Sequence, residues 1–180
     1  MPAVDRSCPH KILAAHFFLG EILLVKAHWY ALKGSEKAMQ KAIKQKLELM
    51  AETRKLYKSV ISYGHPGWTI AAYNQLGKAY QELADTVENA EAPKRIKRIP
   101  GAEDEYLALM AEKAEPIRAK AIENYRTALR VARETRWFNE YSEAAEEAIA
   151  QLDFKDRSVK EFRVKPKRSA PNSAMLNFKT

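Results

Sequence analysis

Apolar residues recur at every third or fourth position over most of this chain, which is the spacing that lines one face of an α-helix. The pattern predicts helices over about 9–32, 35–63, 68–89, 103–133 and 138–152. Ser35 can cap the second of these helices and Gly64 can end it. Pro116 should kink or divide the fourth near Glu115. The sequence therefore predicts an all-α fold.

One stretch of this pattern, YNQLGKAY from Tyr73 to Tyr80, contains a glycine inside a helix. Tyr73, Leu76 and Tyr80 fall on one helix face, and Gly77 lies beside them as a hollow in that face. Glycine destabilises a helix by about 1 kcal/mol relative to alanine, so its usual role there is to let a neighbouring helix approach closely. We expect Gly77 to mark such a contact.

The two halves of the chain share this pattern. Six positions recur with an offset of about 68 residues, roughly twice the 34-residue period of a helix-turn-helix repeat. The pairs are Tyr57 with Tyr125, Val60 with Ala128, Tyr73 with Tyr141, Leu76 with Ala144, Gly77 with Ala145, and Tyr80 with Ala148. A degenerate third copy of the glycine motif is present at His16, Leu19, Gly20 and Leu23. The alternative is an unrelated helical bundle with coincidental spacing.

These motifs resemble the tetratricopeptide repeat (TPR) over about residues 12–152. More narrowly, Gly64-His65-Pro66-Gly67-Trp68 leading into AAYNQLGKAY, and the later KAIENYRTALRVARETRWFNEYSEAAEEAIAQL, are similar to envelope TPR proteins of deltaproteobacteria, including those of myxobacterial gliding motility. The resemblance implies a TPR-like helical solenoid of antiparallel helix pairs with degenerate repeats, whose groove binds partner peptides or helices. It also implies a bacterial periplasmic or outer-membrane-associated location, with any signal segment absent from this sequence, and no enzyme activity.

Composition changes where the helical pattern breaks. We expect a flexible lead-in at 1–8, a helical domain at 9–153 with an insertion at about 90–102, and a basic extended or disordered tail at 154–180. The chain of 180 residues carries a formal net charge of +8. The candidate basic patch consists of Lys94, Arg95, Lys97 and Arg98 in the insertion and Lys165, Lys167 and Arg168 in the tail. This charge supports an alternative function, binding to nucleic acid or an anionic surface.

Catalytic and cofactor motifs are not found in the sequence. The four histidines lack the i, i+4 spacing of a helical metal site, and the phosphate-binding glycine loops and the nucleophile elbow are missing. Cys8 is the one cysteine, so no internal disulfide can form. The apolar run Ile12–Val25 is interrupted by His16 and Glu21 and is too short to span a bilayer. We therefore expect neither an enzyme, a cofactor, a metal site nor a transmembrane segment.

The favoured hypothesis is a scaffold that binds another protein. Asn74, Lys78 and Gln81 occupy non-core positions on the motif helix and could contact a partner, although Asn74 could equally be an ordinary solvated residue. Trp68 and Trp137 each precede or open a motif helix and are candidate interface anchors. Core packing at a helix start is the alternative for both tryptophans.

Overall fold

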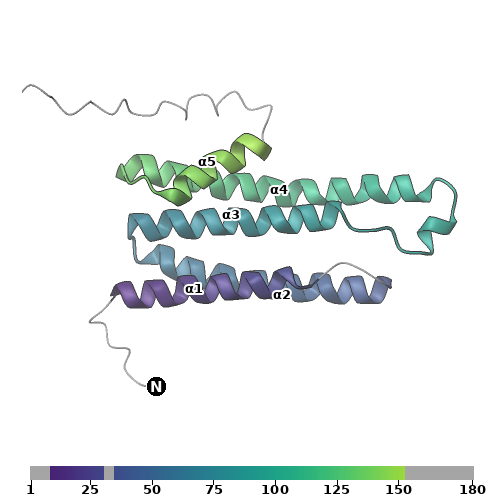
Figure 1. Ribbon diagram of the computed structural model, residues 1–180, viewed down its shortest axis with the longest axis horizontal. Coiled ribbons are helices and arrows are strands. Elements are labelled where there is room, and N and C mark those ends of the chain that lie inside the picture. The colour runs from purple at the N-terminus through teal and green to yellow at the C-terminus, as the bar shows by residue number, and fades with distance from the viewer. Residues whose placement is uncertain (1–8, 31–34, 153–180) are drawn as a thin grey trace, which may run out of the picture.

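The computed structural model describes residues 9–30 and 35–152, and this part of the chain is helical without strands. The helices are α1 (Pro9–His28), α2 (Glu36–Ser62), α3 (Pro66–Glu88), α4 (Ala102–Thr135) and α5 (Glu140–Leu152), with a short 3-10 helix η1 (Ile96–Arg98) before α4 (Figure 1). The predicted all-α class is confirmed for these residues. The lead-in at 1–8 and the tail at 154–180 lie outside the described part.

Local sequence signals set several helix ends. The Ser35 hydroxyl accepts a hydrogen bond from the Ala38 amide at 3.3 Å, as predicted for the start of α2. Beyond α2, Gly64 has a φ of +72°, a left-handed conformation that glycine adopts without steric strain. Pro66 occupies the first turn of α3, where a missing N–H removes no helical hydrogen bond. This is why α3 begins at Pro66 rather than near Trp68.

Pro116 lies inside α4, which is one helix of 34 residues, so of the two expected outcomes, a kink or a division, the division is wrong. Proline removes one backbone donor and crowds the preceding turn. Near this proline, the Arg118 guanidinium donates to Glu115 of the same helix at 2.9 Å and to Glu88 of α3. These ion pairs hold the helix around Pro116 against its neighbour.

The helices pair as two antiparallel hairpins, α1 with α2 and α3 with α4 (Figure 1). In the first hairpin, His16 is hydrogen-bonded to Ser59, and Glu21 accepts a hydrogen bond from Tyr57. The partner's residue number falls as the number along α1 rises, so the two helices are antiparallel. α3 is the central element, because it packs along α4 and also contacts α1, α2 and α5. α5 packs against both helices of the α3/α4 hairpin, and the ring of its Tyr141 lies 6.0 Å from the Phe17 ring of α1 (Figure 1).

The helices of both hairpins are longer than a regular repeat allows. α1, α2, α3 and α4 have 20, 27, 23 and 34 residues, whereas a 34-residue helix-turn-helix unit leaves roughly 15 residues for each helix. The expected insertion corresponds to the connection at 89–101, which contains η1 and ends at Gly101 with a φ of +80°. It forms the tip of the α3/α4 hairpin and projects beyond α1 and α2 (Figure 1).

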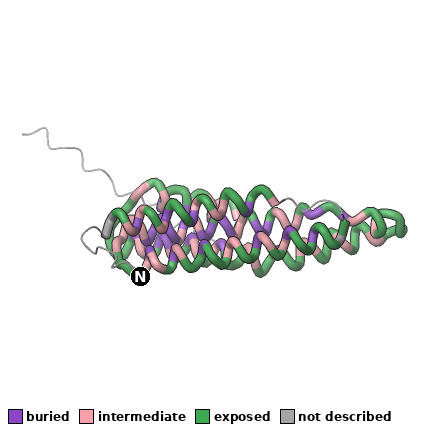
Figure 2. Tube along the Cα trace, turned by 90° about the horizontal axis from the view of Figure 1, so that it is seen from below, coloured by how far each residue is buried: buried purple, intermediate pink, exposed green. Residues whose placement is uncertain are grey.

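Three hydrophobic clusters form the core of the described residues. The smallest contains Met39, Ala42 and Ala90 and joins α2 to the segment after α3. The two larger clusters lie one in each half of the stack. The first joins α3, α4 and α5 and contains Ile70, Ala121, Tyr125, Ala128, Leu129, Ala132, Ala145 and Ile149. The second joins α1, α2 and α3 and contains Leu13, Phe17, Tyr57, Val60, Ala71, Ala72 and Leu76. Buried residues become sparse toward the hairpin tip (Figure 2). The core is therefore concentrated at the end opposite η1.

Each hairpin contains the same close contact between a glycine and a tyrosine. A Cβ atom on Gly77 would lie 2.6 Å from the Tyr125 ring, and one on Gly20 would lie 2.5 Å from the Tyr57 ring. Both distances are far below a van der Waals contact. The prediction that Gly77 permits close approach of a neighbouring helix is confirmed, and Gly20 does the same in the first hairpin.

α1 ends earlier than predicted and keeps an exposed apolar side. It stops at His28, and Trp29 just beyond it is 81% exposed. Among the helices described here, none combines the length and the apolar character needed to cross a bilayer.

Candidate interaction groove

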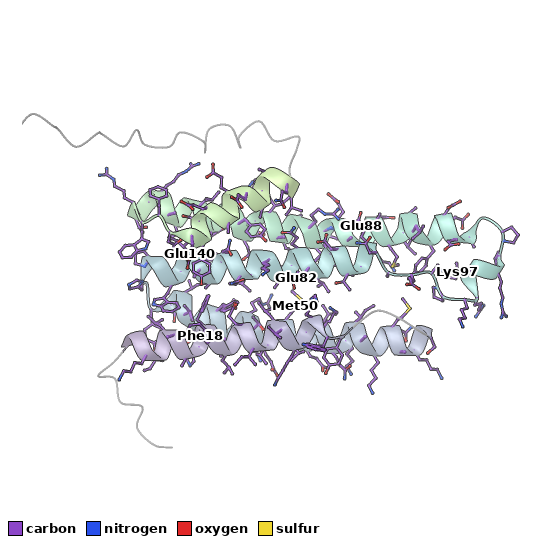
Figure 3. All side chains as sticks on the ribbon, in the orientation of Figure 1. Phe18, Met50, Glu82, Glu88, Lys97 and Glu140 are labelled. Atoms are coloured by element: carbon purple, nitrogen blue, oxygen red, sulfur yellow. The ribbon has the colours of Figure 1, made fainter. Side chains whose placement is uncertain are left out.

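A hollow of about 210 Å³ lies between α1 and α3. Its lining combines apolar side chains with polar and charged ones: Glu21, Leu24, Val25 and His28 from α1, and Gln75, Lys78, Ala79 and Glu82 from α3. Each set follows the helical i, i+3/i+4, i+7 spacing, so a single face of each helix supplies the lining. Figure 3 shows Glu82 on the side of α3 that faces the first hairpin. We refer to this hollow as the α1/α3 groove.

Glu21 is held in place at one wall of the α1/α3 groove. One carboxylate oxygen accepts the Tyr57 hydroxyl at 2.6 Å, and the other accepts the Gln75 amide at 3.3 Å. Burial raises the pKa of the Tyr57 hydroxyl well above its usual value, and its hydrogen bond to the carboxylate raises it further. A single carboxylate therefore ties α1 to both α2 and α3 and fixes the geometry of the groove wall.

Two further charged side chains, Lys78 and Glu82, line the groove, and a third, Lys46, interacts with Glu82. Lys78 and Glu82 lie one turn apart on α3 and are exposed. Behind Glu82, the buried Lys46 of α2 has a lowered pKa because burial disfavours its charged form, while the negative charge of Glu82 partly opposes that shift. The groove thus offers acceptors at Glu21 and Glu82 and a donor at Lys78, which suits hydrogen bonding to the backbone or amide groups of a peptide.

Asn74 does not occupy the exposed position expected for it. It is 5% exposed, and its side-chain amide donates to the Tyr141 carbonyl of α5 at 2.9 Å. Gln81 is half-buried and accepts the Tyr125 hydroxyl at 2.9 Å. Among these three candidate contact residues, Lys78 is the one that lines the α1/α3 groove.

The two candidate tryptophans differ in their surroundings. Trp68 packs against the second core cluster, with its ring 5.3 Å from Phe17 in an edge-on arrangement, as the core-packing alternative expects. Trp137 is 47% exposed in the turn before α5, 5.6 Å from the His65 ring and against Gly67. Neither tryptophan lines the α1/α3 groove.

Sequence reasoning did not identify Glu21, Gln75 and Glu82 as groove residues. The positions of Gln75 and Glu82 follow from extending the face of Lys78 by one turn in each direction along α3. Glu21 lies on α1, and its place in the groove depends on how the two hairpins pack. A larger, open hollow is lined by α2 alone, through Gln40, Ile43, Lys44, Leu47, Glu48 and Ala51. Because a single helix forms it, it brings no separate elements together.

The four basic residues of the insertion surround η1 at the hairpin tip. Lys94, Arg95, Lys97 and Arg98 are all exposed, and the Lys97 ammonium lies 3.7 Å from Glu103 (Figure 3). Ile99, next to them, is 52% exposed. The tail residues Lys165, Lys167 and Arg168 lie outside the described part of the chain.

Within the described residues, no three potential metal ligands of the histidine, cysteine or carboxylate type come together. No protein-family model matches the chain, and no curated protein or solved structure matches it either.

Proposed function

We propose that this protein is a non-enzymatic scaffold that binds a partner peptide or helix in the α1/α3 groove, as the first helices of a TPR-like solenoid do. The observation that carries the proposal is the wall formed by Glu21, whose two oxygens are held by Tyr57 and Gln75 beside the exposed Lys78. A binding site whose polar groups are already fixed loses less conformational entropy when its ligand binds. On the resemblance alone, we place this scaffold in a bacterial envelope or motility assembly.

The size of the groove indicates how much of a partner it accepts. A hollow of about 210 Å³ is smaller than a typical small-molecule pocket of roughly 300–1,000 Å³. It fits one or two side chains of a partner whose neighbouring residues contact the rim of the hollow on α1 and α3. The apolar walls at Leu24, Val25 and Ala79 would contact the aliphatic part of that partner.

Site-specific photocrosslinking in cells of the source organism tests this proposal. A photoreactive phenylalanine analogue replaces Lys78 in one variant and Lys58, an exposed lysine of α2, in a matched control. We expect a covalent adduct to a discrete partner from position 78 that is missing from position 58. With that partner purified, Lys78→Glu should weaken binding by about tenfold, equivalent to about 1.4 kcal/mol. Identical adducts from both positions, or none from position 78, would exclude the groove as the binding site.

A second candidate function is suggested by the hairpin tip. Four exposed cations and the exposed Ile99 project together beyond the first hairpin, an arrangement suited to an acidic partner such as nucleic acid. In a gel-shift titration, affinity for DNA should fall about a hundredfold between about 50 and 200 mM salt if all four cations contact phosphates. Lys94→Glu with Arg98→Glu should abolish binding, and Lys41→Glu with Lys58→Glu serves as the charge-matched control.

A further inference from the structure

The outer face of α1 carries an exposed apolar stripe. Phe18, Ile22 and Val25 of α1 are 58%, 52% and 60% exposed, and Leu19 beside them is 47% exposed. Trp29, in the turn that directly follows the helix, is 81% exposed and extends the stripe. The spacing of four, three and four residues from Phe18 to Trp29 is the a/d spacing with which helices pack in coiled coils. None of the described residues covers this stripe. α1 also has apolar residues on its other sides. A helix that is apolar on all sides usually packs against a neighbour on each of them.

The order of residues along the stripe is nearly symmetric about the midpoint between Leu23 and Leu24. An aromatic residue stands at each end, Phe18 and Trp29, and a β-branched aliphatic residue stands on each inner side, Ile22 and Val25. A two-fold axis through this midpoint brings the same surface of two copies together, which is the requirement for a self-complementary interface. Two antiparallel α1 helices would then place Ile22 opposite Val25 near the axis, and Phe18 opposite the Trp29 that follows the partner's helix at each end.

The exposed area of the stripe is sufficient for a weak dimer. Large aromatic side chains bury 150–250 Å² each, so the five residues expose on the order of 500 Å², which is within the roughly 300–600 Å² of the largest apolar patch on a typical monomer, a patch that is often functional. A two-fold contact over the stripe buries roughly 1,000 Å² in total, which is the lower limit for a specific protein interface.

We propose that this protein forms an antiparallel homodimer through the α1 stripe, in which the α1 helix of a second copy supplies the neighbour that α1 lacks. α1 forms one end of the stack, whereas α3 at the centre has partners on both sides. The second copy therefore continues the packing pattern of the fold. The stripe and the α1/α3 groove meet at Val25, but the dimer does not depend on the groove having a ligand.

Sedimentation velocity on the full chain, at about 1 to 200 µM, tests whether the dimer forms. We expect a concentration-dependent dimer with a micromolar dissociation constant, strengthened at 0.5 M salt because both copies carry a net charge of +8. Ile22→Asp should weaken the dimer at least a hundredfold, because it would place a desolvated carboxylate in the interface. Leu47→Asp is the matched control: it is 50% exposed on α2 and should leave the dimer intact. A chain that stays monomeric at every concentration and salt, or a dimer that Leu47→Asp disrupts as strongly as Ile22→Asp does, would overturn the proposal.

Disulfide trapping tests the orientation. In a Cys8→Ser background, a chain with Phe18→Cys is mixed with a chain with Trp29→Cys and oxidised. An antiparallel contact brings positions 18 and 29 of different copies together, and it keeps two copies of position 18 about 16 Å apart along the axis, at 1.5 Å per residue. We expect the mixed 18–29 disulfide to predominate. Predominance of 18–18 and 29–29 disulfides would overturn the antiparallel arrangement.

Binding to vesicles of phosphatidylcholine and phosphatidylglycerol tests the alternative that the stripe contacts lipid. If the chain is monomeric and binds these vesicles, and Ile22→Asp abolishes that binding, the stripe is a lipid contact and the dimer is overturned.

Discussion

Gly20 and Gly77 each leave space for a tyrosine ring that would clash with any larger residue. Each ring then directs its hydroxyl to an acceptor on the helix that carries the glycine: Tyr57 to Glu21 and Tyr125 to Gln81. The packing and the hydrogen bond together fix how the two helices of a hairpin slide and rotate against each other. At the residue scale, these glycine–tyrosine contacts are the main determinants of hairpin geometry.

Gly77→Ala should destabilise the fold by about 1–3 kcal/mol, although alanine favours helix by about 1 kcal/mol over glycine. The reason is that the added Cβ would lie 2.6 Å from the Tyr125 ring, which is buried, so the ring or the helix must shift to relieve the clash. Urea unfolding followed by circular dichroism measures the change. Lys78→Ala, at the adjacent exposed position, is the control and should change stability by less than about 0.5 kcal/mol. Adding Tyr125→Leu, which removes the ring, should recover most of the stability lost in Gly77→Ala. A Gly77→Ala protein as stable as the parent would refute this account.

The buried tyrosines predict how stability depends on pH. Burial raises the pKa of the Tyr57 and Tyr125 hydroxyls above the ordinary value of 10.0, so above that pH the folded state binds more protons than the unfolded state. Their contribution to stability is therefore complete below about pH 10 and is lost as pH rises further toward the folded pKa values. Tyr57→Phe should lower stability at pH 7 by about 1.5–3 kcal/mol, because it removes a hydrogen bond to a charged acceptor, and should make the alkaline fall less steep. Urea titrations at pH 7, 10 and 11 measure both effects. An unchanged alkaline slope in Tyr57→Phe would contradict the assignment.

At the scale of the single helix, sequence signals were most reliable where they act locally. The positions of all five helices were predicted to within about four residues, because capping by Ser35 and termination at Gly64 depend on neighbours within a turn. The position of Asn74 was not predictable in this way. Its burial is caused by α5, whose Tyr141 carbonyl it binds from 67 residues away in sequence.

Pro116 is a second local signal whose outcome depended on distant residues. α4 continues through the proline, and two residues later Arg118 pairs with Glu88 on α3. Pro116→Ala should stabilise the protein by about 1–3 kcal/mol, since it restores one helical hydrogen bond and relieves the steric clash at an exposed position. Thermal unfolding checks this, with Lys120→Ala one turn later as the control. Loss of stability in Pro116→Ala would show that the local geometry at the proline is required by the packing of α4 on α3.

At the scale of the whole molecule, the core is distributed unevenly along the hairpins. α4 has buried residues from Ala114 to Ala132, whereas the first 12 residues of the same helix have none (Figure 2). Helical segments with few buried contacts open at lower free energy. Backbone amides at 106–113 should therefore exchange hydrogen at least about a hundredfold faster than those at 121–132, as measured by mass spectrometry at pH 7. The same comparison along α2 should show protection at 53–60, and uniform protection along α4 would contradict this distribution of stability.

The candidate groove illustrates which part of a site is predictable from sequence. Lys78 could be identified because helical periodicity placed it off the core face of its own helix. Its opposing wall could not, because Glu21 reaches the groove through the packing of one hairpin against the other, and its orientation is set by Tyr57 and Gln75 from two further helices. Periodicity predicts faces within an element, and the meeting of two faces depends on tertiary structure.

The glycine–tyrosine contacts also determine how this chain can change over evolutionary time. Each contact is confined to one hairpin, so a larger residue at position 77 should be tolerated when position 125 becomes smaller, whatever stands at positions 20 and 57. The same holds for positions 20 and 57 in the first hairpin. Among relatives of this chain, we therefore expect two separately covarying pairs rather than one group of four. The two hairpins would then be able to diverge at different rates while keeping the same internal geometry.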